Sequence, residues 1–210
     1  VQEAPGVRPT AVAFRRYAQP VLLVAMPALW AGGRLAGDRG TAEAGLRATE
    51  AIGAGLVVTG AIKLLAGRER PYVARNPGRW AFLGGLREGS DRASFPSGHT
   101  TVAFAAASAL VAHAARTGDT RDDRWTLGVP LYAAAGLAGL SRMVEDRHWA
   151  SDVVGGALVG TLAGGAVVRW HAGRDGSRVD RWLLGARVHP AWLGTGGGGA
   201  PPPSLVILFR

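Results

Sequence analysis

Five long segments of this chain carry few or no charged residues, and this pattern constrains the fold more than any other feature of the sequence. A surface helix of a soluble domain shows a charged face, and a chain of 210 residues cannot bury five uncharged helices in one core. We therefore predict an all-α helical bundle of five long apolar helices that crosses a membrane. The predicted helices run from Tyr17 to Gly33, Thr41 to Ala66, His99 to Ala115, Trp125 to Met143 and Ser151 to Trp170. Thr41 is the predicted N-cap of the second helix.

Composition and aromatic positions bear on the choice between a membrane protein and a soluble one. The 32 glycines suit close helix packing in a membrane, although the mean hydropathy is only +0.12. Tryptophans near the predicted helix ends resemble an interfacial belt: Trp30, Trp125, Trp149 and Trp170. We expect an integral membrane protein of the cell envelope that contacts membrane lipids. The alternative is an exported, periplasmic protein that buries its apolar faces in a homo-oligomer.

Charge and cysteine content exclude several kinds of site. The net charge is +9, but the arginines are scattered and form no basic run, so no nucleic-acid partner is predicted. The chain has no cysteine, which excludes disulfides and thiolate metal sites. Lys63 is the single lysine among 24 basic residues. A role that a planar guanidinium cannot fill would explain this exception.

The chain divides into a helical domain over residues 1–172 and a basic, Gly/Pro-rich tail over residues 173–210. Gly67 to Ala93 is rich in Arg, Gly and Pro, and we predict a long structured loop with a functional role. Ser204 to Phe209 is predicted to be a short strand or a docking segment. Val1 as first residue fits removal of an upstream signal or helix.

Three polar clusters lie at predicted helix ends. Lys63 and Arg70 are seven residues apart, two helical turns, and so face the same way. The second cluster is Pro-Ser-Gly-His, residues 96–99, where a helix begins. The third is residues 141–152, between the last two predicted helices. If the helices alternate in direction, all three clusters meet at one end of the bundle.

The residue types in these clusters suit the binding of a tetrahedral oxyanion. Three cations are available, and backbone N–H groups at the start of a helix add further donors. A histidine followed four residues later by an aspartate allows the carboxylate to orient the imidazole. One carboxylate and no cysteine provide poorly for a divalent metal, so neither a metal nor another cofactor is predicted. The predicted anion ligands are Lys63, Arg70, Ser97, Gly98 and Arg142. The predicted catalytic residues are His99, His148 and Asp152.

These clusters resemble the signature of the type 2 phosphatidic acid phosphatase superfamily. That signature is Lys, six residues, Arg-Pro; then Pro-Ser-Gly-His; then Ser-Arg, five residues, His, three residues, Asp. Every position is met in order between Lys63 and Asp152. The superfamily includes lipid phosphate phosphatases, bacterial nonspecific acid phosphatases and vanadium haloperoxidases.

The resemblance implies a role for each matching residue. His148 would attack phosphorus to form a phosphohistidine, and Asp152 would orient its ring. His99 would protonate the leaving alkoxide and then activate water. The phosphoryl oxygens would be held by Lys63, Arg70, Ser97, Gly98 and Arg142.

We therefore expect a metal-independent phosphomonoesterase that hydrolyses a lipid phosphate, a lipid pyrophosphate or a similar phosphoester on the non-cytoplasmic face. One alternative is a vanadate-dependent haloperoxidase, because the same cradle can hold vanadate. Another is a non-catalytic membrane subunit that retains the anion site.

Three groups of residues are given no catalytic role. Arg68, Glu69, Arg75, Arg79, Arg87 and Arg92 are expected to be solvated or structural, Glu145, Asp146 and Arg147 to pair locally, and His113, His171 and His189 to be structural or exposed.

Overall fold

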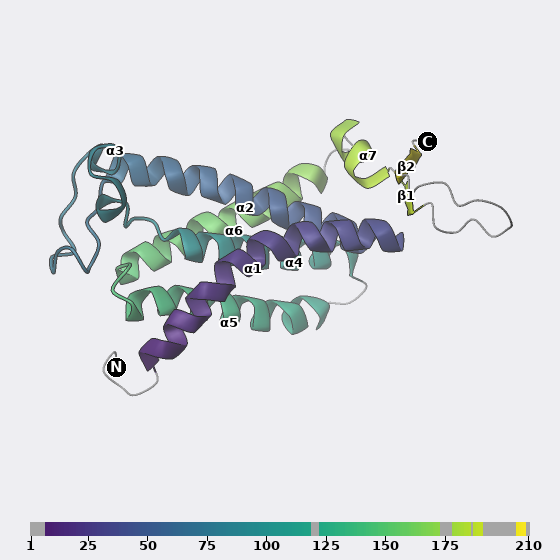
Figure 1. Ribbon diagram of the computed structural model, residues 1–210. Helices are drawn as coiled ribbons and strands as arrows, with labels where there is room; N and C mark the ends of the chain where they lie inside the picture. Colours follow the sequence, from purple (N-terminus) through teal and green to yellow (C-terminus); the bar gives the residue numbers. More distant parts are fainter. Residues whose placement is uncertain (1–6, 119–121, 173–177, 186, 191–204, 209–210) are drawn as a thin grey trace, which may run out of the picture.

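The computed structural model describes residues 7–118, 122–172, 178–185, 187–190 and 205–208. Four of its long helices run side by side along one direction, and α1 crosses them obliquely (Figure 1). The predicted all-α bundle of five long helices is confirmed. These helices are α1 (Val7–Ala36), α2 (Arg39–Ala66), α4 (Gly98–Thr117), α5 (Asp122–Val144) and α6 (Ala150–Ala172).

Helix boundaries differ from the prediction, most of all at α1, which begins at Val7 rather than at Tyr17. Thr41 as N-cap of α2 is wrong: Asp38 caps the helix and accepts hydrogen bonds from Thr41 N at 3.1 Å and Thr41 Oγ1 at 2.6 Å. A carboxylate at the end of a tight turn is an equally good cap, so the helix begins earlier. A further helix, α7 (Arg178–Gly185), lies in the predicted tail. β1 (Arg187–Pro190) pairs antiparallel with β2 (Leu205–Leu208), where a short strand was one of two expectations.

Small residues allow the helices to approach each other closely. The most extensive helix contact joins α4 and α6. Gly156, Gly160 and Gly164 are spaced four apart on α6, so they form one stripe along the helix. A Cβ on Gly160 would lie 2.8 Å from Ala105 N, and one on Gly164 would lie 2.6 Å from Ser108 Cβ. The Gly and Ala content therefore reflects backbone-to-backbone packing rather than weak hydrophobicity.

The outward faces of the bundle are apolar. By length and composition, three described helices could cross a membrane: α2, α5 over Trp125–Val144, and α6. The side chain of Val57 is 74% exposed and that of Leu162 is 66% exposed. Such surfaces suit a hydrocarbon environment better than water. The composition of these helices supports the predicted membrane protein.

The segment between α2 and α4 folds over one end of the bundle, as predicted for a structured loop. It contains α3 (Gly84–Arg87) and a 3₁₀ turn, η1 (Gly89–Arg92). Gly67 ends α2 with φ +53°, and a Cβ there would collide with the Ala81 carbonyl oxygen, so only glycine fits. The loop thus stays close to the C-terminal end of α2, where the first polar cluster lies.

Candidate active site

A cavity of about 530 Å³ opens at this end of the bundle. All three polar clusters contribute to its lining, as the alternation of helix directions predicts. Among the described residues, no carboxylate side chain lines the cavity. From the predicted site, the lining residues are Lys63, Arg70, Gly98, His99, Arg142 and His148, and the others are Gln19, Pro20, Tyr72, Ser90 and Arg147.

His148 lies just before α6 and faces Asp152 in the first turn of that helix. Its Nδ1 is 3.5 Å from Asp152 Oδ2, longer than an ordinary hydrogen bond but typical of a catalytic pair without substrate. The pKa of His148 is lowered to about 4, mainly because the side chain is buried and in part because Lys63 and Arg70 are close, while Asp152 opposes these effects. The imidazole is therefore neutral at pH 7. With its Nδ1 directed at the carboxylate, the lone pair of Nε2 is available for chemistry.

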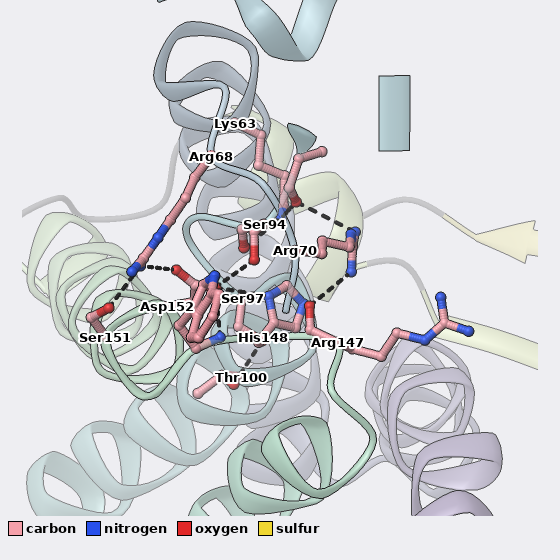
Figure 2. A network of polar contacts seen from close by, with 12 residues as sticks. Lys63, Arg68, Arg70, Ser94, Ser97, Thr100, Arg147, His148, Ser151 and Asp152 are labelled. Atoms are coloured by element: carbon pink, nitrogen blue, oxygen red, sulfur yellow. Dashed lines mark hydrogen bonds and ion pairs between the residues drawn. The ribbon is translucent and has the colours of Figure 1, made fainter. Parts of the chain in front are cut away.

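Asp152 is completely buried and is held by three donors besides His148 (Figure 2). Oδ1 accepts a hydrogen bond from Arg68 Nη1 at 2.5 Å. Oδ2 accepts from Ser94 Oγ at 2.5 Å and from the Trp149 backbone N at 2.9 Å. A buried carboxylate requires such partners to remain ionised. These contacts fix which oxygen faces the imidazole.

Arg68 is a buried side chain that the sequence analysis left without a catalytic role. Its Nη1 also donates to Ser151 Oγ at 2.7 Å, and its Nε and Nη2 donate to Pro77 O at 3.1 and 2.9 Å. The guanidinium lies 4.5 Å from the centroid of the Trp80 ring and 5.7 Å from that of Trp149. Arg68 is thus held rigidly between two aromatic rings. The sequence did offer one signal for its role: Arg68 lies between Lys63 and Arg70, just beyond the end of α2.

The cations of the pocket are held by carbonyl groups of the overlying loop. Lys63 Nζ donates to Ala93 O at 2.5 Å and to Ser94 O at 3.4 Å. Arg70 Nε donates to Ser90 O at 2.7 Å, and its Nη1 donates to Arg147 O at 3.2 Å. Carbonyl oxygens hold these side chains in place, and none of these contacts is an ion pair with a carboxylate.

Arg142 closes α5 and pairs with Glu145, whose side chain is also buried. The prediction that Glu145 pairs locally is confirmed. Because both members of the pair are almost completely buried, the guanidinium of Arg142 is fixed at the cavity wall rather than free to move. This pair adds no net charge to the site, unlike Lys63 and Arg70.

The start of α4 brings the Pro-Ser-Gly-His cluster to the cavity. Gly98 and His99 line it, whereas Ser97 lies behind them with its side chain completely buried. Ser97 N donates to Asp152 O at 2.9 Å, and Ser97 Oγ accepts from Thr100 Oγ1 at 2.9 Å. The Ser97 backbone N–H therefore ties the start of α4 to the aspartate segment, while its hydroxyl bonds within the first turn of α4.

A group of side chains at the opposite end of the bundle has the composition of a metal site. Glu50, His171 and Asp180 bring their ligand atoms within 4.8 Å of one another. Arg47 lies among them, with its Nη1 2.8 Å from Asp180 Oδ1 and 3.1 Å from Glu50 Oε2. His171 contacts Glu50 through Nε2 at 3.0 Å and Asp180 through Nδ1 at 3.1 Å. A guanidinium in this position repels a metal cation, so the group fits an ion-pair network that fastens α7 to α2.

The fold and pocket together define a class of protein, namely a helical bundle with an anion-attracting pocket at one end. The family model of the PAP2 superfamily, the type 2 phosphatidic acid phosphatases whose signature the sequence resembles, matches residues 44–175. The chain therefore belongs to that superfamily. The lipid A 1-phosphatase of Porphyromonas gingivalis is 43% identical over 91 residues, which are 42% of this chain and 19% of that protein. The match thus spans about a fifth of the relative's length. No solved structure matches the chain.

Proposed function

We propose that this protein is a phosphatase that hydrolyses a lipid phosphate, a lipid pyrophosphate or a similar phosphoester without a metal ion. The observation that carries the proposal is a buried, neutral His148, backed by Asp152, in a cavity lined by cations and by no carboxylate. Membership of the PAP2 superfamily supports a phosphoester substrate. The similarity to a lipid A 1-phosphatase supports a lipid-linked one.

The proposed reaction has two steps with a covalent intermediate. Nε2 of His148 attacks phosphorus and forms a P–N bond as the P–O bond to the leaving group breaks, and His99 donates a proton to the departing alkoxide. His99 then removes a proton from water, which attacks the phosphohistidine and releases phosphate. Asp152 stabilises the imidazolium form of His148. The side chains of Lys63, Arg70 and Arg142 and the Gly98 amide donate hydrogen bonds to the phosphoryl oxygens. The positive charge of Lys63 and Arg70 takes the place of a metal.

The activity is tested by phosphate release in detergent from phosphatidic acid, lipid A, undecaprenyl pyrophosphate and p-nitrophenyl phosphate. We expect release that persists with a chelator, falls with vanadate and is lost in His148→Ala by a factor of about 10⁴ or more. Undiminished turnover in His148→Ala would refute the mechanism. Phosphate binding without hydrolysis of any substrate would favour a non-catalytic subunit, and peroxide-dependent halide oxidation after vanadate loading would favour a haloperoxidase.

We further propose that the pocket faces the non-cytoplasmic side of a membrane. Because the chain has no cysteine, single cysteines can report on sidedness. Arg87 lies at the end of α3, in the loop at the pocket end of the bundle, and Arg116 lies in the last turn of α4, at the opposite end. Each is replaced by cysteine in turn. In intact cells, a membrane-impermeant maleimide should label Arg87→Cys, and it should label Arg116→Cys only after permeabilisation. The reverse pattern would place the pocket in the cytoplasm.

A further inference from the structure

The cavity contains a fourth cation, Arg147, that lies outside the family signature. Arg147 lines the same cavity as Lys63 and Arg70. At about 530 Å³, the cavity lies within the range of small-molecule sites, roughly 300–1,000 Å³. Its volume therefore accommodates a substrate head group larger than a single phosphoryl group.

Arg147 is held in a different way from the other cations of the pocket. Its backbone oxygen accepts the hydrogen bond from Arg70, and its guanidinium lies 4.9 Å from the centroid of the Tyr72 ring. The Tyr72 hydroxyl donates to Asp91 Oδ1 at 2.6 Å, which fixes the ring. The Arg147 side chain points away from His148 and Asp152 (Figure 2).

Local pairing with an acid, expected from the sequence, does not occur for Arg147. Within the described part of the chain, its charged group contacts an aromatic face and forms no ion pair with a carboxylate. The guanidinium of Arg147 is repelled by the positive charges of Lys63 and Arg70 in the same pocket, and an anion between these groups removes that repulsion. An aromatic face leaves the N–H groups of the guanidinium available to such an anion.

We propose that Arg147 and Tyr72 form a second anion subsite, which binds a second anionic group on the substrate while Lys63 and Arg70 hold the group that reacts. The proposal rests on the proposed function for its substrate class, a head group with two phosphates. These can be joined, as in a diphosphate, or separated by a short spacer. Arg147 then sets the preference for such substrates over monophosphates of the same tail.

A catalytic test compares farnesyl diphosphate with farnesyl monophosphate in the same detergent. For Arg147→Gln we expect kcat/KM on the diphosphate to fall at least about tenfold, as for a lost charge-assisted hydrogen bond. The monophosphate should change less than about threefold, and Arg147→Lys should recover part of the loss. Arg75→Gln, an exposed arginine of the same loop, removes the same charge and should leave the ratio of the two substrates unchanged. An equal loss on both substrates, or no loss, would overturn the proposal.

A binding test separates failure of the subsite from failure of the proposed function. Methylphosphonate, methylenediphosphonate and propane-1,3-diphosphonate are titrated into the intact protein by calorimetry. Arg147→Gln should reduce the advantage of one diphosphonate over methylphosphonate about tenfold, and the ligand affected distinguishes joined from separated phosphates. If the protein hydrolyses no phosphoester but this loss is seen, the proposed function fails and the subsite stands. An unchanged advantage for both diphosphonates would refute the subsite even in an active phosphatase.

Discussion

The two ends of the bundle place arginine and histidine side chains in opposite surroundings. At the α7 end, Arg47 is surrounded by carboxylates, and His171 contacts two of them. At the pocket end, Lys63 and Arg70 are held by backbone carbonyl groups, and no carboxylate lines the cavity. One end is thus a network of ion pairs. At the other end, Lys63 and Arg70 form no ion pair with a carboxylate among the described residues.

This difference separates a structural cluster from a candidate binding site more clearly than residue type does. By composition alone, the group of Glu50, His171 and Asp180 resembles a metal site. Arg47 pairs with Glu50 and Asp180 within this group, and its guanidinium repels a metal cation. At the pocket end, Asp152 is buried behind the cavity wall, where it pairs with Arg68.

Among the changes that compare the two ends of the bundle, the largest effect is expected from removing a cation of the pocket. Arg70→Gln should lower kcat/KM by about 10²- to 10³-fold, because the lost side chain would stabilise charge that develops in the transition state. Arg39→Gln, at the cavity beside α7, removes the same charge from the other end and should change kcat/KM by less than about twofold. Equal losses from both variants would mean that the pocket acts only through the net charge of the protein.

A smaller effect is expected from Arg68→Gln, because Arg68 acts through Asp152 and does not line the cavity. Loss of a buried hydrogen bond to a charged group costs about 1.5–3 kcal/mol, or roughly 10- to 100-fold in kcat. KM for the substrate should change little. Arg87→Gln, an exposed arginine of the same loop, is the matched control and should retain full activity. A rise in KM with unchanged kcat would assign Arg68 to substrate binding instead.

The pH dependence provides a third test. The pKa of His148 is about 4 in the folded protein, against about 6.5 for an unperturbed histidine. Between these values the unfolded chain binds more protons, so the free energy of unfolding decreases as the pH falls from about 6.5 to 4, and this loss is absent above 6.5. The acidic limb of kcat/KM should lie near pH 4, measured where circular dichroism shows folded protein. A limb near 6.5 would show that His148 is not desolvated.

The smallest effect on activity is expected at the α7 end. His171→Gln removes the side chain that contacts both Glu50 and Asp180, and should loosen α7 from the bundle. Hydrogen exchange of the amides in residues 178–185 should become faster, while kcat/KM changes by less than about twofold. A large loss of activity with unchanged exchange would contradict the separation of the two ends.

The bundle and the polar clusters were predictable because they depend on local patterns. Long uncharged segments define the helices. Helical periodicity does not bring Lys63 and Arg70 together, because α2 ends at Ala66 and Arg70 lies in the loop beyond it. His148 lies just before α6 and Asp152 lies in its first turn, so their four-residue spacing does bring them together. Convergence of the clusters followed from alternating helix direction alone. The pairing of Glu145 with Arg142 was likewise a three-residue helical neighbour relation.

What the sequence could not supply were contacts across large separations. Arg68 and Asp152 are 84 residues apart, and Ser94 and Asp152 are 58 apart. Their meeting depends on how the loop over residues 67–97 folds, which no short-range period encodes. Arg147 is adjacent to His148, but the aromatic surroundings that leave it without a carboxylate partner come from Tyr72 on that same loop. α7 was not predicted because it has only eight residues and lies in a polar, glycine-containing tail, where so short an amphipathic pattern does not stand out.

The central claim is that His148 carries the phosphoryl group during turnover. Rapid mixing of the protein with a ³²P-labelled substrate, followed by alkaline quench and peptide mapping, tests it directly. We expect an acid-labile, base-stable label on the peptide that contains His148, formed at the rate of the first step and absent in His148→Ala. Turnover with no label on this peptide, or with label on another residue, would contradict the account.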